Sequence, residues 1–431
     1  MLISFSVENF KSIRDLQTIS MEAQADDRFE HRNVFRAEKH RLLKSAAIYG
    51  PNASGKSNVI EAMIWFRQFV LSSSKDSQAE EPISINPFRL STVTEHAPSR
   101  FDAEFLIEGI EFRYGFTVNS TQVKSEWLYR KSPGKKTVRL FSRETDSEKS
   151  EIFDVSPKHF KEGKGLEVRT RKNALFLSVC AQFNVAAAEL ILRWIIRFQY
   201  VSGLSELGFF AFTAGRLMED GYRQRLLELA KTADLNITSL ETEVKEFDPG
   251  SAPSKVPPEI WRKMFEEQFR RIKTGHPKRD ESGKIVGIVE FDLKADESQG
   301  TQKFIALSGP ITHTLEEGSI LVIDELEAKL HPLLTQAIVD LFHSPVNRHD
   351  AQIIFATHDI TLMDPDRFRR DQIWFCEKDE AGATDLYSLA DLDSNQVRPT
   401  TKFSRQYLQG LFGAVPKLAH FQEAAADATK N

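Results

Sequence analysis

The fold of this chain is decided by the stretch Gly50-Pro51-Asn52-Ala53-Ser54-Gly55-Lys56-Ser57, which fits the pattern G-x-x-x-x-G-K-[ST] without a mismatch. A short apolar segment at 42–49, expected to be a strand, precedes the stretch, and a segment with helical periodicity at 58–71 follows it. A strand–loop–helix context is the one in which this pattern forms a phosphate-binding loop, or P-loop. Backbone N–H groups of such a loop and the positive end of its helix bind phosphate oxygens.

The P-loop predicts that the chain binds ATP with Mg²⁺ and hydrolyses it. Lys56 is expected to contact the β- and γ-phosphates and so to act in catalysis, and the Ser57 hydroxyl is expected to bind Mg²⁺. The other residues expected at the nucleotide are Gly50, Pro51, Asn52, Ala53, Ser54, Gly55 and Asn58.

An apolar strand at 320–323 ends in Asp324 and Glu325. Asp324 is expected to orient Mg²⁺ through water, and Glu325 to activate the attacking water as a general base. A solvated acidic turn is the alternative, and the P-loop favours the catalytic interpretation. Because Ser57 and Asp324 are far apart in sequence, we expect the nucleotide-binding fold to be split by an insertion.

Ser298, Gln299, Gly300 and Thr301 begin a predicted helix shortly before Asp324, and such a helix N-terminus can bind an anion. Their placement resembles the signature motif of ABC-type ATPases, which contacts the γ-phosphate in a second subunit, although the usual Leu-Ser-Gly-Gly-Gln is absent. A simple helix cap is the alternative for Ser298. His358 follows a strand at 353–356 and resembles the switch histidine of the same ATPases, with a purely structural histidine as the alternative.

Five segments stand in the order of an ABC-type head and together resemble the RecF/SMC/OLD-like ATPases: 9–13, 50–58, 297–301, 324–332 and 357–358. A closer resemblance is to the stand-alone RloA or AbiLi-like ATPases. That resemblance is carried by the strings at 173–178, 297–302, 324–332, 370–375 and 407–416.

The resemblance implies an α/β fold, namely an ABC-type P-loop ATPase head with an antiparallel β-lobe and a helical insertion. It also implies that Lys11 touches the nucleotide and that two chains form a homodimer or larger homo-oligomer around ATP. The implied role is an antiphage or abortive-infection switch that controls a separately encoded effector, TOPRIM-like or another nuclease.

Two alternatives to this role remain. One is a RecF-like DNA repair or maintenance ATPase that binds DNA in an ATP-dependent way. The other is a chain that itself cuts nucleic acid, because Arg271 and His276 fit R-x-x-x-x-H, a pattern that often occurs by chance.

The predicted organisation has three parts: 1–145 with the P-loop and β-lobe, a helical insertion at 146–284, and 285–431 with the signature, acidic and histidine motifs. The β-lobe strands are expected at 101–107, 110–118, 124–130 and 137–142, and the insertion helices at 174–198, 215–233 and 258–273. After residue 285, strands at 285–293, 319–323, 352–356 and 372–377 alternate with helices at 302–311 and 332–342, which predicts a largely parallel sheet.

The net charge of −5 does not favour nucleic-acid or membrane binding by bulk charge. Without a predicted membrane span or signal peptide, and with only two cysteines, the chain is expected to be cytoplasmic. Two local basic clusters could contact phosphates, but a solvated surface is favoured for both; Arg370 could instead pair with a carboxylate. These clusters are Arg169, Arg171 and Lys172, and Arg367, Arg369 and Arg370.

Overall fold

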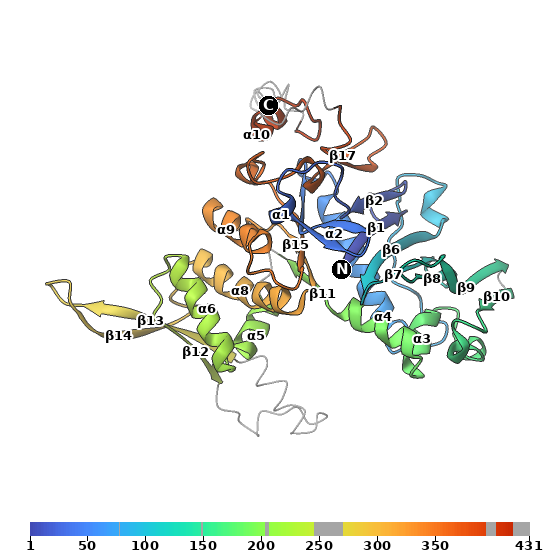
Figure 1. Ribbon diagram of the computed structural model, residues 1–431, viewed down its shortest axis with the longest axis horizontal. Helices are drawn as coiled ribbons and strands as arrows, with labels where there is room; N and C mark the ends of the chain where they lie inside the picture. Colours follow the sequence, from blue (N-terminus) through green and yellow to red (C-terminus); the bar gives the residue numbers. More distant parts are fainter. Residues whose placement is uncertain (77, 148–149, 203–206, 245–269, 394–401, 417–431) are drawn as a thin grey trace, which may run out of the picture. The chain divides into compact units, whose positions relative to one another are not determined.

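A computed structural model describes residues 1–76, 78–147, 150–202, 207–244, 270–393 and 402–416 (Figure 1). The chain forms two compact units: a first unit of Met1–Ile196 with Phe355–Asn431, and a second unit of Arg197–Ile354. The bounds of these two units differ from those of the three predicted segments, 1–145, 146–284 and 285–431. The three segments stay a prediction about domain organisation.

The first unit contains a seven-stranded antiparallel sheet, the predicted β-lobe. Its strand order is β10-β9-β8-β7-β6-β1-β2. The N-terminal strand belongs to this lobe because β1 pairs with both β2 and β6. The bounds are β1 Leu2–Glu8, β2 Gln17–Ser20, β6 Ser99–Ile107, β7 Ile110–Val118, β8 Val123–Lys131, β9 Val138–Ser147 and β10 Ser150–Val155.

The buried face of the lobe packs on helix α2, Lys56–Ser72. Phe66 of α2 stacks on Phe116 with ring centroids 5.6 Å apart and meets Phe5 edge to face. Such aromatic contacts fix the orientation of α2 on the sheet, and with it the position of the loop that precedes the helix.

The strand that leads into the P-loop belongs to a parallel strand pair of the same unit. Strand β5, Ser45–Tyr49, is wholly buried and pairs in parallel with β17, Ile373–Lys378, which pairs antiparallel with β18, Thr384–Ser388. β16, Gln352–Ala356, leads the chain into this unit, where Thr357 N donates to Ile48 O at 3.0 Å. Smaller elements are α1 Glu30–Asn33, β3 Val34–Ala37, β4 His40–Leu43 and α10 Phe403–Leu408.

Two short helices complete the described part of the first unit: α3, Phe176–Gln182, and α4, Ala186–Ile196. The buried Glu126 carboxylate accepts the N–H groups of Phe176 and Leu177, so it serves the N-terminus of α3, and burial raises the pKa of Glu126. Within the described residues no single helix has the length and apolarity to cross a bilayer, although α3 and α4 pass that test as a pair bent by 107°.

The second unit combines a parallel strand pair, helices and a separate three-stranded sheet. β11, Phe198–Ser202, pairs in parallel with β15, Ile320–Asp324. The helices are α5 Leu207–Arg216, α6 Asp220–Thr232, α8 Gln299–Glu317 and α9 Pro332–His343. A hydrophobic core holds α5, α6 and α8 against the sheet through Phe210, Leu226, Ile272 and Ile305.

A three-stranded sheet adds strands to the predicted helical insertion. Its antiparallel strands are β12 Ser239–Val244, β13 Arg270–Arg279 and β14 Ile285–Asp292, in the order β12-β13-β14. The helices predicted at 174–198 and 215–233 correspond to α3 with α4 and to α6. The predicted helix at 258–273 is wrong at 270–273, which lie in β13; 258–269 lie outside the described residues. Ile272 and Thr274 are buried, whereas Arg271 and Lys273 are more exposed, and this two-residue period is that of a strand.

The α/β class, with a P-loop between strand and helix and an antiparallel β-lobe, is confirmed. The strands predicted at 285–293 and 319–323 correspond to β14 and β15, and the helices at 302–311 and 332–342 to α8 and α9.

Candidate nucleotide-binding site

The P-loop joins β5 to α2 by a backbone path that needs glycine at two positions. Gly50 has φ 153° and Gly55 has φ 110°. A Cβ on Gly50 would overlap the carbonyl oxygen of Cys376, and a Cβ on Gly55 would overlap the Thr384 hydroxyl. Both conformation and space therefore exclude other residues here.

Lys56 is the first residue of α2, and its side chain turns back into the loop. Its Nζ donates to Gly50 O at 2.8 Å and to Pro51 O at 3.1 Å, and the residue is buried. The neighbouring Cys376 remains a neutral thiol, because burial raises its pKa to about 12 although the Lys56 charge acts in the opposite direction. The loop therefore encloses a positive charge, which an anionic phosphate would complement.

Helix α2 begins without a side-chain cap. Its N-cap is Gly55, which has no side chain and so makes no side-chain cap hydrogen bond. Ser54 is also buried, and its Oγ has no hydrogen-bond partner in the described part of the chain. A buried hydroxyl without a partner costs about 1–3 kcal/mol, which a phosphate oxygen accepting from Ser54 would offset. The loop therefore fits a phosphate chain.

A network of side-chain hydrogen bonds holds the P-loop against two distant segments. Asn58 Nδ2 donates to Ser12 Oγ at 2.5 Å, and Ser12 and Thr384 hydroxyls are 2.7 Å apart. Thr384 Oγ1 donates to Ser54 O at 2.9 Å. Since Thr384 gives its proton to Ser54, Ser12 donates to Thr384. We call Ser12, Asn58 and Thr384 the loop clamp.

The loop clamp contains one residue that sequence reasoning placed at the nucleotide, Asn58, and two that it missed. Ser12 lies in the resemblance segment 9–13, which was the only signal for it. Thr384 starts β18, a strand without any motif, so only the fold reveals its role.

Two other predicted residues lie in the first unit. Lys11 forms an ion pair with Glu61 of α2, and burial lowers its pKa. His358 is exposed and follows Thr357, whose N–H bonds to Ile48 of β5, two residues before the P-loop. His358 thus follows a strand end that lies beside β5, the strand that leads into the P-loop. The contacts of Lys11 and His358 with nucleotide stay predictions.

The acidic motif lies in the second unit, at the end of β15. Asp324 is the last strand residue and is paired in register with Ser202. Glu325 follows with φ 54°, a left-handed conformation that costs a non-glycine residue energy and is frequent at functional sites. Its carbonyl accepts from Nζ of the buried Lys303 at 3.2 Å, which ties it to α8.

The signature segment lies in the same unit, at the start of α8. Ser298 is the N-cap: its Oγ accepts from Thr301 N at 3.1 Å and lies 2.9 Å from Thr301 Oγ1. The helix-capping alternative is therefore realised, and the contact with nucleotide in a second subunit stays a prediction. A Cβ on Gly300 would come within 3.0 Å of Lys329 O, so glycine lets α8 approach the loop after Glu325.

In the cluster at 169–172, Arg169 and Lys172 are exposed, as expected of a solvated surface. The cluster at 367–370 is largely built into the first unit, which corrects the expectation of solvated surface there. Arg369 is fully buried, pairs with Asp371 at 2.7 Å and donates to the carbonyls of Gln24 and Arg28. Arg370 donates to the carbonyls of Leu389 and Leu392 rather than to a carboxylate.

The pattern Arg271–His276 falls on strand β13, where His276 bonds to Glu297 at 2.6 Å. Glu297 also accepts from Thr274 Oγ1, so His276 belongs to a contact between β13 and the start of α8. This arrangement explains His276 as a structural residue of the second unit.

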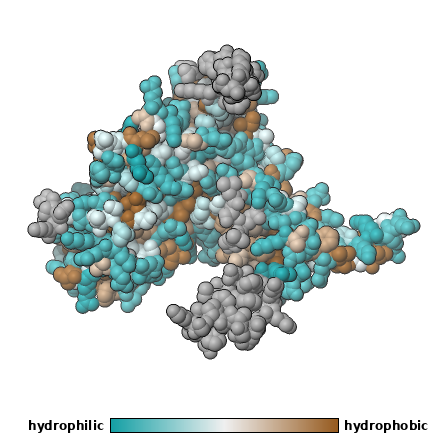
Figure 2. All heavy atoms as spheres, turned by 180° about the vertical axis from the view of Figure 1, so that it is seen from behind, coloured by the Kyte–Doolittle hydropathy of each residue, from teal (hydrophilic) through white to brown (hydrophobic). Residues whose placement is uncertain are grey.

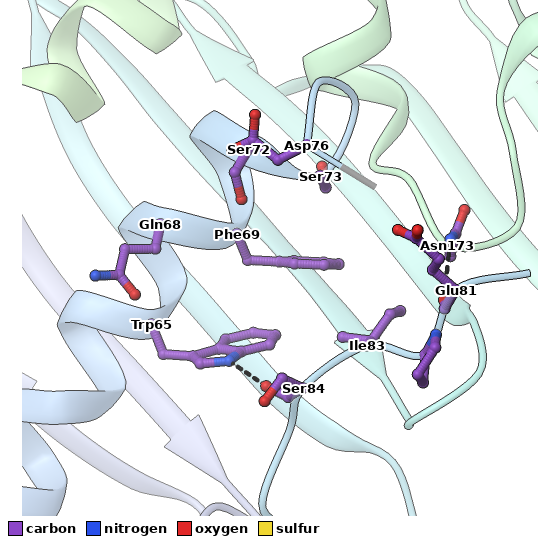
Figure 3. Close-up of a pocket in the computed structure, with 11 residues that line it drawn as sticks. Trp65, Gln68, Phe69, Ser72, Ser73, Asp76, Glu81, Ile83, Ser84 and Asn173 are labelled. Carbon is purple, nitrogen blue, oxygen red and sulfur yellow. Dashed lines mark hydrogen bonds between the residues drawn. The ribbon is translucent and has the colours of Figure 1, made fainter. Parts of the chain in front are cut away.

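A separate cavity of about 300 Å³ lies in the first unit beside α2 (Figure 3). Trp65 and Phe69 reach from α2 toward Ile83 and Ser84, and Trp65 Nε1 donates to Ser84 O at 2.8 Å. Phe69 and Phe101 stack on Trp65, so little of its ring surface is left for a ligand. No predicted site residue lines this cavity.

The family described as "AAA domain, putative AbiEii toxin, Type IV TA system" matches residues 45–364. No curated protein matches the chain. Among solved structures, the chain is similar to "SMC head domain from Thermotoga maritima", with 14% identity, a TM-score of 0.38, and coverage of 90% of this chain and 98% of that one.

Two further solved structures are similar to the chain at comparable sequence identity. "Crystal structure of the SmcHead bound to the C-winged helix domain of ScpA" has 12% identity and a TM-score of 0.42, over 90% of this chain and 97% of that one. "Structure of the recombination mediator protein RecF-ATPrS in RecFOR pathway" has 12% identity and a TM-score of 0.28, over 90% and 98%.

Proposed function

Because the chain belongs to this AAA-domain family, we propose that it is an ATP-hydrolysing switch of a bacterial antiphage or abortive-infection system. ATP closes two copies around nucleotide, and hydrolysis releases them. The family description, which names a toxin of a toxin–antitoxin system, supports the defence role.

The observation that carries the proposal is the P-loop. Gly50 and Gly55 shape it, Lys56 places a buried ammonium inside it, and the buried Ser54 hydroxyl has no partner in the described residues. These features together match what a phosphate chain requires: positive charge, donors, and close approach of the backbone.

The chemical step uses the acidic motif. Ser57 and Asp324 would hold Mg²⁺, which would neutralise part of the charge on the phosphates. Glu325 takes a proton from the attacking water, the water oxygen bonds to the γ-phosphorus, and the bond to the β-phosphate oxygen breaks to give ADP and phosphate. His358 contacts the γ-phosphate, and Lys11 contacts the nucleotide.

Closure depends on a second copy. Ser298, Gln299, Gly300 and Thr301 at the start of α8 contact the ATP held by the other chain, so the closed dimer binds ATP more tightly than the monomer does. A ligand shifts such an equilibrium only by its difference in affinity for the two states. The closed and open forms then control a separately encoded effector.

The RecF-like alternative has less support from this chain. DNA binding rests on basic groups that are available to phosphates. In the cluster at 367–370, Arg369 and Arg370 instead bond to carbonyls and a carboxylate of their own unit. The exposed Arg169 and Lys172 are few against a net charge of −5.

The test is the mass of the full chain by light scattering, with and without ATP-Mg²⁺, for Glu325→Gln. Removing the base should slow hydrolysis by about 100-fold or more, so that the variant accumulates as an ATP-dependent dimer. Glu327→Gln in the same loop is the matched control and should turn over ATP like the wild type. An unchanged mass with ATP demonstrably bound to the Glu325→Gln chain would contradict closure by a second copy.

A further inference from the structure

Strand β14 is an apolar edge strand of the second unit. It is the last strand in the order β12-β13-β14 and pairs within the described residues only with β13. Ile285, Val286 and Ile288 are 54%, 57% and 60% exposed, and Val289 is 38% exposed. Proteins normally protect such edges with charges inside the strand, and β14 carries none between Ile285 and Val289.

Figure 1 shows β13 and β14, in yellow, extending beyond the helices of the second unit. In Figure 2 this hairpin, at the right of the view, carries hydrophobic residues among hydrophilic ones. Because adjacent residues of a strand point to opposite faces, the exposure of both Ile285 and Val286 means that solvent reaches both faces of β14, and not only its edge.

The backbone of β14 is open to a further strand. Gly275 O accepts from Thr238 N on the β12 side of β13, at 2.8 Å. Because alternate residues of a strand direct their N–H and C=O groups to opposite sides, His276 faces β14 and pairs with Val289. Ile288 and Glu290 therefore direct their backbone groups away from β13, to the open side.

The sequence of β14 is complementary to itself in one orientation. Basic Lys284 precedes the apolar run and acidic Glu290 follows it. Antiparallel pairing of two such strands places the apolar runs opposite each other and Lys284 of each copy beside Glu290 of the other. Parallel pairing would instead place like charges together, which destabilises a sheet.

We propose that β14 is a self-association strand, which pairs antiparallel with β14 of a second copy and joins two chains without nucleotide. A two-fold contact of this kind is self-complementary, as a closed homodimer requires. The contact is separate from the ATP-dependent closure proposed above and does not depend on it. Each chain thereby offers two different dimer contacts.

The orientation is tested by charge exchange on the full chain, without nucleotide, by sedimentation over a range of concentrations. Lys284→Glu alone and Glu290→Lys alone should each weaken the dimer by about tenfold, because each creates two like-charge pairs. The double variant Lys284→Glu/Glu290→Lys should restore wild-type association. Failure of the double variant to restore it would overturn the antiparallel pairing.

The surface is tested by Ile288→Lys, with Val346→Lys as a control of the same 60% exposure in the same unit. Ile288→Lys should abolish the nucleotide-free dimer and keep the thermal unfolding and ATP turnover of the wild type, whereas Val346→Lys should still dimerise. A wild-type chain that stays monomeric without nucleotide, or equal loss in both variants, would overturn a second copy as the occupant of β14. Loss of ATP-driven closure in Glu325→Gln has no bearing on this result, so the two proposals fail separately.

Discussion

Two helix N-termini were predicted to face phosphates, and they begin in opposite ways. Helix α2 follows Gly55, which has no side chain and so makes no side-chain cap hydrogen bond. Helix α8 follows Ser298, whose hydroxyl already accepts from Thr301 N. The first therefore has donors that a ligand can satisfy, whereas the second satisfies part of its own.

The way each helix begins separates a preformed nucleotide-binding site, at α2, from a surface that could complete the site of a second copy, at α8. At α2 the loop is held by the loop clamp, by Lys56 and by glycine conformations before any ligand arrives. At α8, a phosphate would have to use the backbone near Gly300 or replace the Thr301 contact of Ser298. We infer that α2 supplies most of the affinity for nucleotide and that α8 supplies discrimination between open and closed forms.

The larger expected effect of a substitution is at α2, on the affinity for ATP. Thr384→Val keeps the shape of the side chain but removes the donor to Ser54 O and the acceptor for Ser12. We expect ATP affinity to fall at least about tenfold, since two hydrogen bonds are lost and each contributes about 1 kcal/mol. Thr384→Ser, which keeps the hydroxyl, is the control and should bind within a factor of about three. Equal binding by both variants, measured calorimetrically, would show that the loop clamp is irrelevant to affinity.

The smaller expected effect is at α8, on the free energy of unfolding. Ser298→Ala removes the cap and should lower the free energy of unfolding by about 1 kcal/mol, and Ser298→Asp, another good cap, should restore it. ATP binding by the isolated chain should be unchanged in both. The double variant Ser298→Asp/Glu325→Gln keeps the cap and removes the hydroxyl. Its ATP-driven dimerisation therefore shows whether the Ser298 hydroxyl contacts nucleotide in addition to capping α8. Dimerisation as strong as with Ser298 would leave capping as the whole role of this side chain.

Local patterns in the sequence predicted the P-loop and the elements on both sides of it, because eight consecutive residues carry both the shape and the chemistry. The β-lobe strands were also predictable, since their alternation is local. The pairing of β1 with β6 was not, because it joins residues about a hundred positions apart in sequence.

Other features depended on tertiary context. Arg369 resembles a surface cation in sequence, yet it is buried because Asp371 and three carbonyls surround it. Thr384 has no motif, and its role appears only when β18 pairs with β17 beside the P-loop strand. The start of strand β13, at 270–273, was predicted as helix because Arg270, Arg271 and Lys273 give it the polarity of an exposed helix face.

The central claim is that the loop at 50–57 binds ATP through Lys56. The most direct measurement is calorimetric titration of ATP-Mg²⁺ into the wild type, Lys56→Ala and Lys75→Ala, an exposed lysine of the same unit. We predict saturable binding by the wild type and Lys75→Ala, and at least about 100-fold weaker binding by a folded Lys56→Ala chain, because the lost contact is a charge-assisted one to phosphate. Binding of equal strength by all three chains would contradict the account.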